Sequence, residues 1–94
     1  MLTTRTIISR SDGITHRRLA GERGGVLLAL GTGAYHSVNG LGMQIWELLE
    51  RPMTLGGLSA AVAGQLHDAP AELAADVAGF VQGLSERDLV ELSG

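Results

Sequence analysis

A chain of 94 residues without cysteine predicts one small domain that contains neither disulfides nor thiolate metal sites. The net charge of −3 is unevenly spread: residues 1–38 hold five arginines and two acids (+3), and residues 39–94 hold two arginines and eight acids (−6), which argues against a nucleic-acid surface. Lysine is missing and the three histidines lack metal-ligand spacing, so we expect no lysine-based catalysis, no metal and no cofactor.

The N-terminal residues 1–13 have weak patterning and end in the turn signal Ser-Asp-Gly. We interpret them as an N-terminal arm or irregular segment, in which residues 6–9 form either a short strand or an ordered arm. No apolar stretch is long enough for a signal peptide or a membrane span, so we expect a cytoplasmic protein. The folded domain is predicted to span residues 14–94.

Three short segments then have the patterns of β-strands. Residues 14–19 (ITHRRL) suit an edge strand that arginines keep soluble, and residues 26–30 (VLLAL) suit the most buried strand. The Gly-Thr-Gly at residues 31–33 predicts a tight hairpin connection to residues 34–38 (AYHSV). Together they predict a three-stranded antiparallel sheet whose outer strand stays open.

Apolar residues next recur at helical spacing in three segments. Asn39 is the predicted N-cap of the first helix, which ends before Pro52. Thr54 is the predicted N-cap of the second helix, and the third begins near Pro70. Residues 87–92 form either a last helical turn or a short extended piece. Strands followed by helices predict an α+β fold with a winged-helix-turn-helix outline.

The sequence shows no arrangement of catalytic side chains. We find no Ser/His/Asp or Cys/His set with a triad-like context, and the glycine-rich stretches 21–25 and 31–33 lack the rest of a nucleotide-binding loop. The carboxylates near the third helix are interpreted as a solvated face and as charges that favour the helix dipole. We therefore predict that the protein is not an enzyme.

Three kinds of binding function remain open. An open edge strand can accept an extended peptide through main-chain hydrogen bonds, with the third helix supplying side-chain specificity. A winged helix would suit a small DNA-binding regulator, but residues 70–86 contain no Arg or Lys and carry Glu72, Asp76 and Glu86. The open edge would also serve to pair two copies of the chain as a dimer.

The ordered set of elements resembles the PqqD-like family, whose domains recognise ribosomally made, post-translationally modified peptides. The resemblance covers roughly residues 14–92, and the free-standing length is similar to the stand-alone members that serve lasso-peptide biosynthesis. No single motif is diagnostic, whereas the ordered set is fairly specific. The residues that carry it are Tyr35, Val38-Asn39, Ile45-Trp46-Glu47-Leu48-Leu49, Thr54, Asp76-Val77, Phe80 and Leu84.

The resemblance implies a non-catalytic domain that binds the leader segment of a precursor peptide and delivers it to a leader peptidase and an ATP-dependent cyclase. In such domains the leader adds as a strand beside the third strand and lies against the third helix. For the apolar helix residues, burial in the core is the alternative role. Carried onto this chain, the predicted peptide-binding residues are Ala34, Tyr35, His36, Ser37, Val38, Leu73, Asp76, Val77, Phe80, Leu84 and Arg87.

The chain departs from the family pattern mainly at the ends of helices. The usual Asp-Gly after the first helix is replaced by residues 50–52, Glu-Arg-Pro. Ala69 stands where an Asp cap usually precedes Pro70, a change that costs about 1 kcal/mol of capping unless Asp68 substitutes. The closing Gly-Leu of the pattern is Asp88-Leu89 here. The last two departures concern the geometry of helix ends more than binding.

Overall fold

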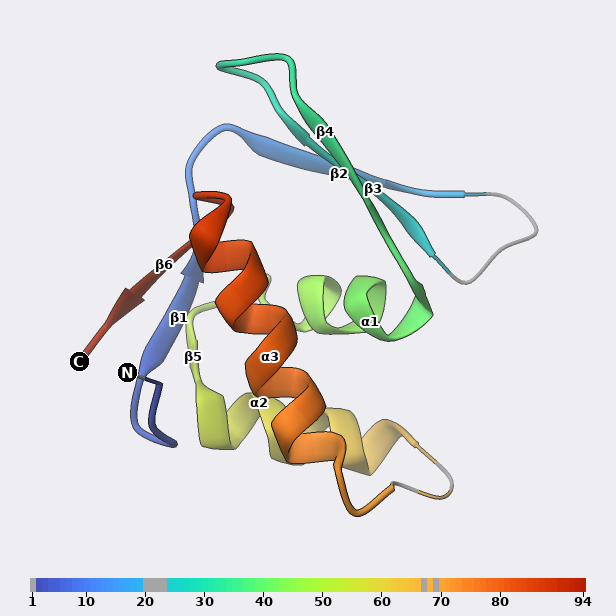
Figure 1. Cartoon of the computed structure of the whole chain (residues 1–94), viewed down its shortest axis with the longest axis vertical. Coiled ribbons are helices and arrows are strands. Elements are labelled where there is room, and N and C mark those ends of the chain that lie inside the picture. Colours follow the sequence, from blue (N-terminus) through green and yellow to red (C-terminus); the bar gives the residue numbers. More distant parts are fainter. Residues whose placement is uncertain (1, 20–23, 67, 69) are drawn as a thin grey trace.

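The computed structural model describes residues 2–19, 24–66, 68 and 70–94. Two small antiparallel sheets and three helices make up the described fold (Figure 1). The first sheet has the order β5-β1-β6 and the second the order β2-β3-β4. In chain order the elements are β1 (Ile7–Arg10), β2 (Ile14–Arg18), β3 (Gly25–Ala29), β4 (Tyr35–Val38), α1 (Gly40–Leu48), β5 (Met53–Thr54), α2 (Leu55–Gln65), α3 (Leu73–Glu86) and β6 (Val90–Ser93).

The predicted α+β fold with antiparallel strands and three helices is confirmed. The three predicted strands form the second sheet, and each of their ends lies within one residue of the expected bound. The sequence analysis did not predict the first sheet, and the winged-helix comparison stays a prediction. None of the described helices is long and apolar enough to cross a bilayer.

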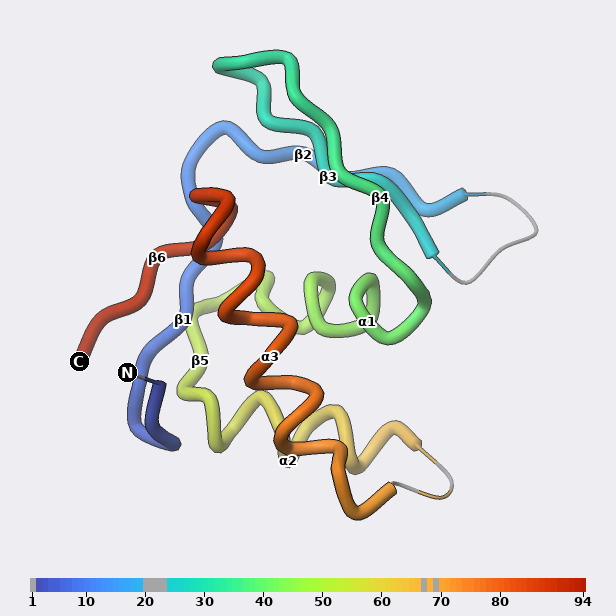
Figure 2. Tube along the Cα trace, viewed as in Figure 1, coloured from blue at the N-terminus to red at the C-terminus, as the bar shows by residue number. Residues whose placement is uncertain are grey.

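The first sheet joins the two ends of the chain. Strand β1 pairs antiparallel with β6, Ile8 opposite Leu92, and on its other side with the short strand β5, Ile7 opposite Thr54. The tube in Figure 2 shows β1 and β6 side by side near both termini. Residues 7–10 are thus a strand, and residues 90–93 are extended, which decides two alternatives that the sequence left open. The predicted division into an arm (residues 1–13) and a domain (residues 14–94) stays a prediction. The side chain of Ile8, within the predicted arm, is fully buried.

Side-chain caps fix the starts of two helices as predicted. The Asn39 Oδ1 accepts a hydrogen bond from the Gly42 N–H at 2.7 Å, and the Thr54 Oγ1 accepts one from the Gly57 N–H at 3.0 Å. Helix α3 differs, because it begins at Leu73 and not near Pro70. The three residues before it form a turn in which the Leu73 N–H donates to the Pro70 carbonyl at 3.1 Å, and no side chain caps the helix. Ala69 lies outside the described residues.

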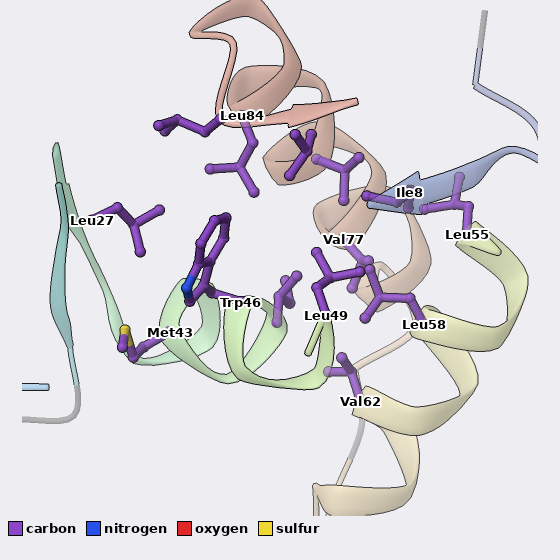
Figure 3. Packing of buried hydrophobic residues seen from close by; sticks show 14 of the residues in the cluster. Ile8, Leu27, Met43, Trp46, Leu49, Leu55, Leu58, Val62, Val77 and Leu84 are labelled. Atoms are coloured by element: carbon purple, nitrogen blue, oxygen red, sulfur yellow. The ribbon is translucent and has the colours of Figure 1, made fainter. Parts of the chain in front are cut away.

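The core lies between the two sheets and the helices, with Trp46 of α1 near its centre (Figure 3). The Trp46 Nε1–H donates to the Nδ1 of His16 on β2 at 3.0 Å. On another side, the guanidinium of Arg10 on β1 stacks 4.6 Å from the indole centroid and donates to the Trp46 carbonyl at 2.5 Å. Burial lowers the pKa of Arg10, and the carboxylates of Glu50 and Glu47 oppose this shift. Trp46 therefore links both sheets to α1.

Candidate functional site

Strand β4 has an open edge. Among the described strands it pairs only with β3. The Ala29 N–H donates to the Ala34 carbonyl at 2.8 Å, so these two residues are a hydrogen-bonded pair. Because such pairs alternate along an antiparallel ladder, the main-chain groups of His36, two residues on, also point toward β3. The main-chain N–H and C=O groups of Tyr35 and Ser37 therefore point toward the open edge.

The side chains of β4 divide between the two faces of the sheet. His36 and Val38 are half-buried on the face that carries the fully buried Leu27. Tyr35 and Ser37 lie on the opposite face, where 71% of the Tyr35 surface is exposed. The side chains of His36 and Val38 thus face the helical side of the molecule, and those of Tyr35 and Ser37 face away from it.

Helix α3 runs in the opposite direction to β4, and two pockets connect their ends. Asn39 and Gly40, which follow β4, line a pocket of about 560 Å³ together with Asp76 of the first turn of α3. At the other end, Ala34 and His36 line a pocket of about 530 Å³ together with Arg87, which follows α3. We call these two pockets, and the face of α3 between them, the β4–α3 site.

One stripe of α3 carries the side chains of this site. Asp76, Phe80, Gly83 and Arg87 recur at spacings of four, three and four residues, which places them on one face of the helix. Asp76 is exposed and Phe80 is half-buried. A Cβ at Gly83 would lie 3.9 Å from the Arg87 Nη1, so the guanidinium turns back along the helix over this glycine. The stripe therefore places an acid at one end, an aromatic ring in the middle and a cation near the other end.

No described residue forms an ion pair with either end charge of the stripe, although other charged side chains line the same pockets. Arg18 also lines the first pocket, but its guanidinium forms an ion pair with Glu47 of α1, with the Nε 3.2 Å from the Oε2. Within the described part of the chain, neither Asp76 nor Arg87 has an ion-pair partner. Asp12 and Asp88 line the second pocket with Arg87, whose guanidinium turns back along α3 over Gly83. A ligand would therefore not have to displace an ion-pair partner of either end charge among the described residues.

Three of the predicted site residues belong to the core. Val77, Leu84 and Leu73 have exposed fractions of 0%, 1% and 5%, as their alternative role required. Leu73 still contributes to the wall of the first pocket. The other eight predicted residues lie on β4, on the exposed and half-buried side of α3, or directly beside these elements, as Ala34 does before β4 and Arg87 after α3. The structure therefore separates the supporting residues from those that a ligand could reach.

The sequence did not point to several residues that line the first pocket. Arg18 comes from the end of β2, and the others come from α1 and its N-cap, from the end of α2 and from the turn before α3. Only the turn signals and caps that place these three helix ends side by side could have indicated them. Beyond the predicted residues, the lining of this pocket consists of Arg18, Asn39, Gly40, Leu41, Gln44, Leu66 and Pro70.

The chemistry of the site is that of binding an extended chain. Its strand edge offers donors and acceptors of the main chain, and its helix stripe offers one acid, one aromatic ring and one cation. Among the described residues, no group of three or more His, Asp or Glu side chains could hold a metal ion. The geometry is thus suited to adding a strand whose alternate side chains meet α3.

Comparisons with a family model and with solved structures each found matches. The family model described as coenzyme PQQ synthesis protein D (PqqD) matches residues 24–90. The structure "TbiB1 in Complex with the TbiA(beta) Leader Peptide" superposes with a TM-score of 0.73 and 25% identity, covering 88% of this chain and 94% of that one. A lasso peptide synthetase B1 complexed with the leader peptide gives 0.70 and 18%, covering 89% and 96%. No protein of curated function matches the sequence significantly.

Proposed function

Because the chain belongs to the PqqD family, we propose that it binds the leader segment of a ribosomally made precursor peptide in lasso-peptide biosynthesis. The leader pairs as an additional strand with the open edge of β4 and lies against α3. The observation that carries this proposal is the open edge itself, where Tyr35 and Ser37 direct their main-chain groups outward beside α3. The likeness to TbiB1, whose structure contains a leader peptide, supports it.

The main chain of β4 supplies much of the proposed affinity. Tyr35 and Ser37 each offer one N–H and one C=O, which allows up to four hydrogen bonds to an added strand. Hydrogen bonds of this kind contribute about 0.5–1.5 kcal/mol each. Such contacts do not depend on the side chains of the leader, so they provide affinity and register more than specificity.

Side chains provide the proposed specificity. Asp76, Phe80 and Arg87 of the stripe face the added strand, and His36 and Val38 flank it from the helical face of the sheet. Ala34 lies at the end of the strand in the second pocket. Val77 and Leu84 hold α3 against the core and make no direct contact with the leader, and Leu73 does so only at the rim of the first pocket.

We further propose that the protein is a carrier and not a catalyst. It holds the leader while a leader peptidase and an ATP-dependent cyclase act on the precursor in the cytoplasm. Support comes from the solved structures, which are complexes of B1 proteins with leader peptides. No nucleic-acid partner is proposed, because the exposed side of α3 carries Asp76 and Glu86 and residues 73–86 contain no Arg or Lys.

The proposal is tested by titrating the protein into a fluorescein-labelled synthetic leader from the precursor gene beside its own gene. Fluorescence anisotropy should rise to saturation, and a peptide with the same residues in shuffled order should bind much more weakly. A second check is amide hydrogen exchange, in which Tyr35 and Ser37 should gain protection when the leader is added. No saturable binding of the leader would contradict the proposed function.

A further inference from the structure

We propose that the β4–α3 site selects a leader segment with a basic residue, an apolar residue two positions later and an acidic residue four positions after the basic one. This inference rests on the proposed leader binding and names the sequence that the same site recognises. It is argued from the charges of Asp76 and Arg87, from the length of the site and from the direction of the strand.

Opposite charges at the two ends of the site give it an electrostatic direction. Asp76 lies beside Asn39 at the C-terminal end of β4, and Arg87 lies beside Ala34 at the N-terminal end. The other cation of the first pocket, Arg18, forms an ion pair with Glu47. The second pocket also contains the acids Asp12 and Asp88, so Arg87 favours an acid where its guanidinium turns back over Gly83, toward the middle of the stripe. A basic side chain of the leader is therefore favoured near Asp76, and an acidic one near Arg87.

The length of the site fixes the spacing between these two side chains. Arg87 follows Asp76 by eleven positions, which places their Cα atoms about 16 Å apart along the axis of α3. The Arg87 guanidinium turns back over Gly83, which is only about 10 Å along this axis from Asp76. In an added strand, side chains that face α3 recur about every 6.6 Å, at roughly 7, 13 and 20 Å for two, four and six residues. The acidic side chain should therefore lie between about 10 and 16 Å from the basic one, and among these spacings only that of four residues, about 13 Å, falls in this range.

The direction of the added strand fixes the order of the charges. Antiparallel pairing is slightly more stable than parallel pairing, so we take the leader as antiparallel to β4. It then runs from the Asn39 end toward the Ala34 end, and its residue near Asp76 comes first. The side chain midway between the two charges faces the half-buried ring of Phe80, which favours an apolar residue there.

A charge scan of the leader tests this order and spacing. Each position of the labelled leader is replaced in turn by Lys and by Glu, and the Kd of every peptide is measured for the wild type and for Asp76→Lys and Arg87→Glu. We expect Asp76→Lys to invert the preference from Lys to Glu at one position, and Arg87→Glu to invert it from Glu to Lys four residues later. Exposed ion pairs predict inversions of about three- to tenfold, decreasing with added salt.

Matched variants control for net charge and stability. Glu86→Lys makes the same charge change on α3 outside both pockets, and Arg51→Glu does so after α1. Neither variant should invert the preference for Lys or Glu at any position of the leader. Three results would overturn this inference while leader binding stands. The preference for Lys or Glu inverts at no position of the leader, the two positions where it inverts are not four residues apart, or the acidic position comes before the basic one. If the unmodified leader does not bind the wild type, both proposals fail.

Discussion

The ring of Phe80 lies directly against the backbone of Gly42. A Cβ at residue 42 would be only 2.7 Å from the Phe80 Cε1 and 2.8 Å from its Cζ, and 3.2 Å from the Asn39 Oδ1 that caps α1. Real Cβ atoms are essentially never found at the two shorter distances. Glycine at this position therefore allows α1 and α3 to meet closely and holds the ring at its depth in the β4–α3 site.

The first prediction concerns this contact. Gly42→Ala should lower the free energy of unfolding by about 1–3 kcal/mol, because the methyl group displaces the Phe80 ring or shifts α1. The displaced ring should also weaken leader binding. Gly79→Ala on the exposed side of α3 is the matched control: no atom lies within 4 Å of its Cβ, so it should raise stability by about 0.5–1 kcal/mol. Urea unfolding measures the stability of both variants. If Gly42→Ala is as stable as the wild type, the close contact between residue 42 and the Phe80 ring does not require glycine.

A second prediction concerns the hydrogen bond that joins Trp46 to His16. In a double-mutant cycle of Trp46→Phe and His16→Ala, the coupling energy should be about 0.5–1.5 kcal/mol, the usual contribution of one hydrogen bond. The cycle is measured by urea unfolding at a pH where histidine is neutral. The same cycle with His36→Ala, which lacks this bond to Trp46, should be additive. A coupling near zero in the first cycle would show that the bond adds no stability.

The C-terminal end of α3 gives a third prediction. The Leu89 N–H donates to the Leu84 carbonyl at 2.9 Å and the Asp88 N–H to the Ser85 carbonyl at 3.1 Å, which together form a Schellman motif. Asp88 occupies the left-handed position of this motif with φ of 59°, where the family pattern has glycine. Asp88→Gly should therefore raise the free energy of unfolding by about 0.5–1 kcal/mol, and Asp88→Val should lower it. A loss of stability in Asp88→Gly would contradict this account.

Local signals in the sequence were sufficient for the second sheet and the caps. The Gly-Thr-Gly hairpin and the apolar run at residues 26–30 indicate β3 and β4, and the side chains of Asn39 and Thr54 make the hydrogen bonds that their positions suggested. The first sheet could not be predicted in this way. Its strands have two to four residues, and β1 meets β6 across about 80 residues of chain, so their pairing depends on tertiary packing and not on a local pattern.

The peptide-binding role of the predicted residues stays a prediction, but the family resemblance and the helical spacing of α3 did indicate where some of them lie. Asp76 and Arg87 do line pockets beside β4. What the sequence could not give is which residues of β4 direct their main chain outward. This depends on the hydrogen bond between Ala29 and Ala34, which is set by the exact geometry of the turn. Likewise, the apolar spacing of α3 could not separate the buried Val77 from the half-buried Phe80.

The outward direction of alternate residues in β4 leads to the last prediction. Ser37→Pro removes an N–H that points to the open edge, so it should leave the fold intact and weaken leader binding by about two- to tenfold, as the loss of one hydrogen bond predicts. His36→Pro removes an N–H that points into the hairpin and leaves the Leu27 carbonyl without its partner. It should therefore lower the free energy of unfolding by about 1–3 kcal/mol.

Measuring both properties for both variants separates these two effects. Stability is taken from urea unfolding and affinity from leader titration at a temperature where each variant is folded. Ser37→Ala is the control for the side chain, because it keeps the main-chain N–H, and its affinity should match that of the wild type. If Ser37→Pro unfolds the protein while His36→Pro only weakens binding, then His36, and not Ser37, directs its main chain to the open edge of β4. If Ser37→Pro keeps both fold and affinity, the leader does not pair with this edge, because its ladder would need the donor that proline lacks.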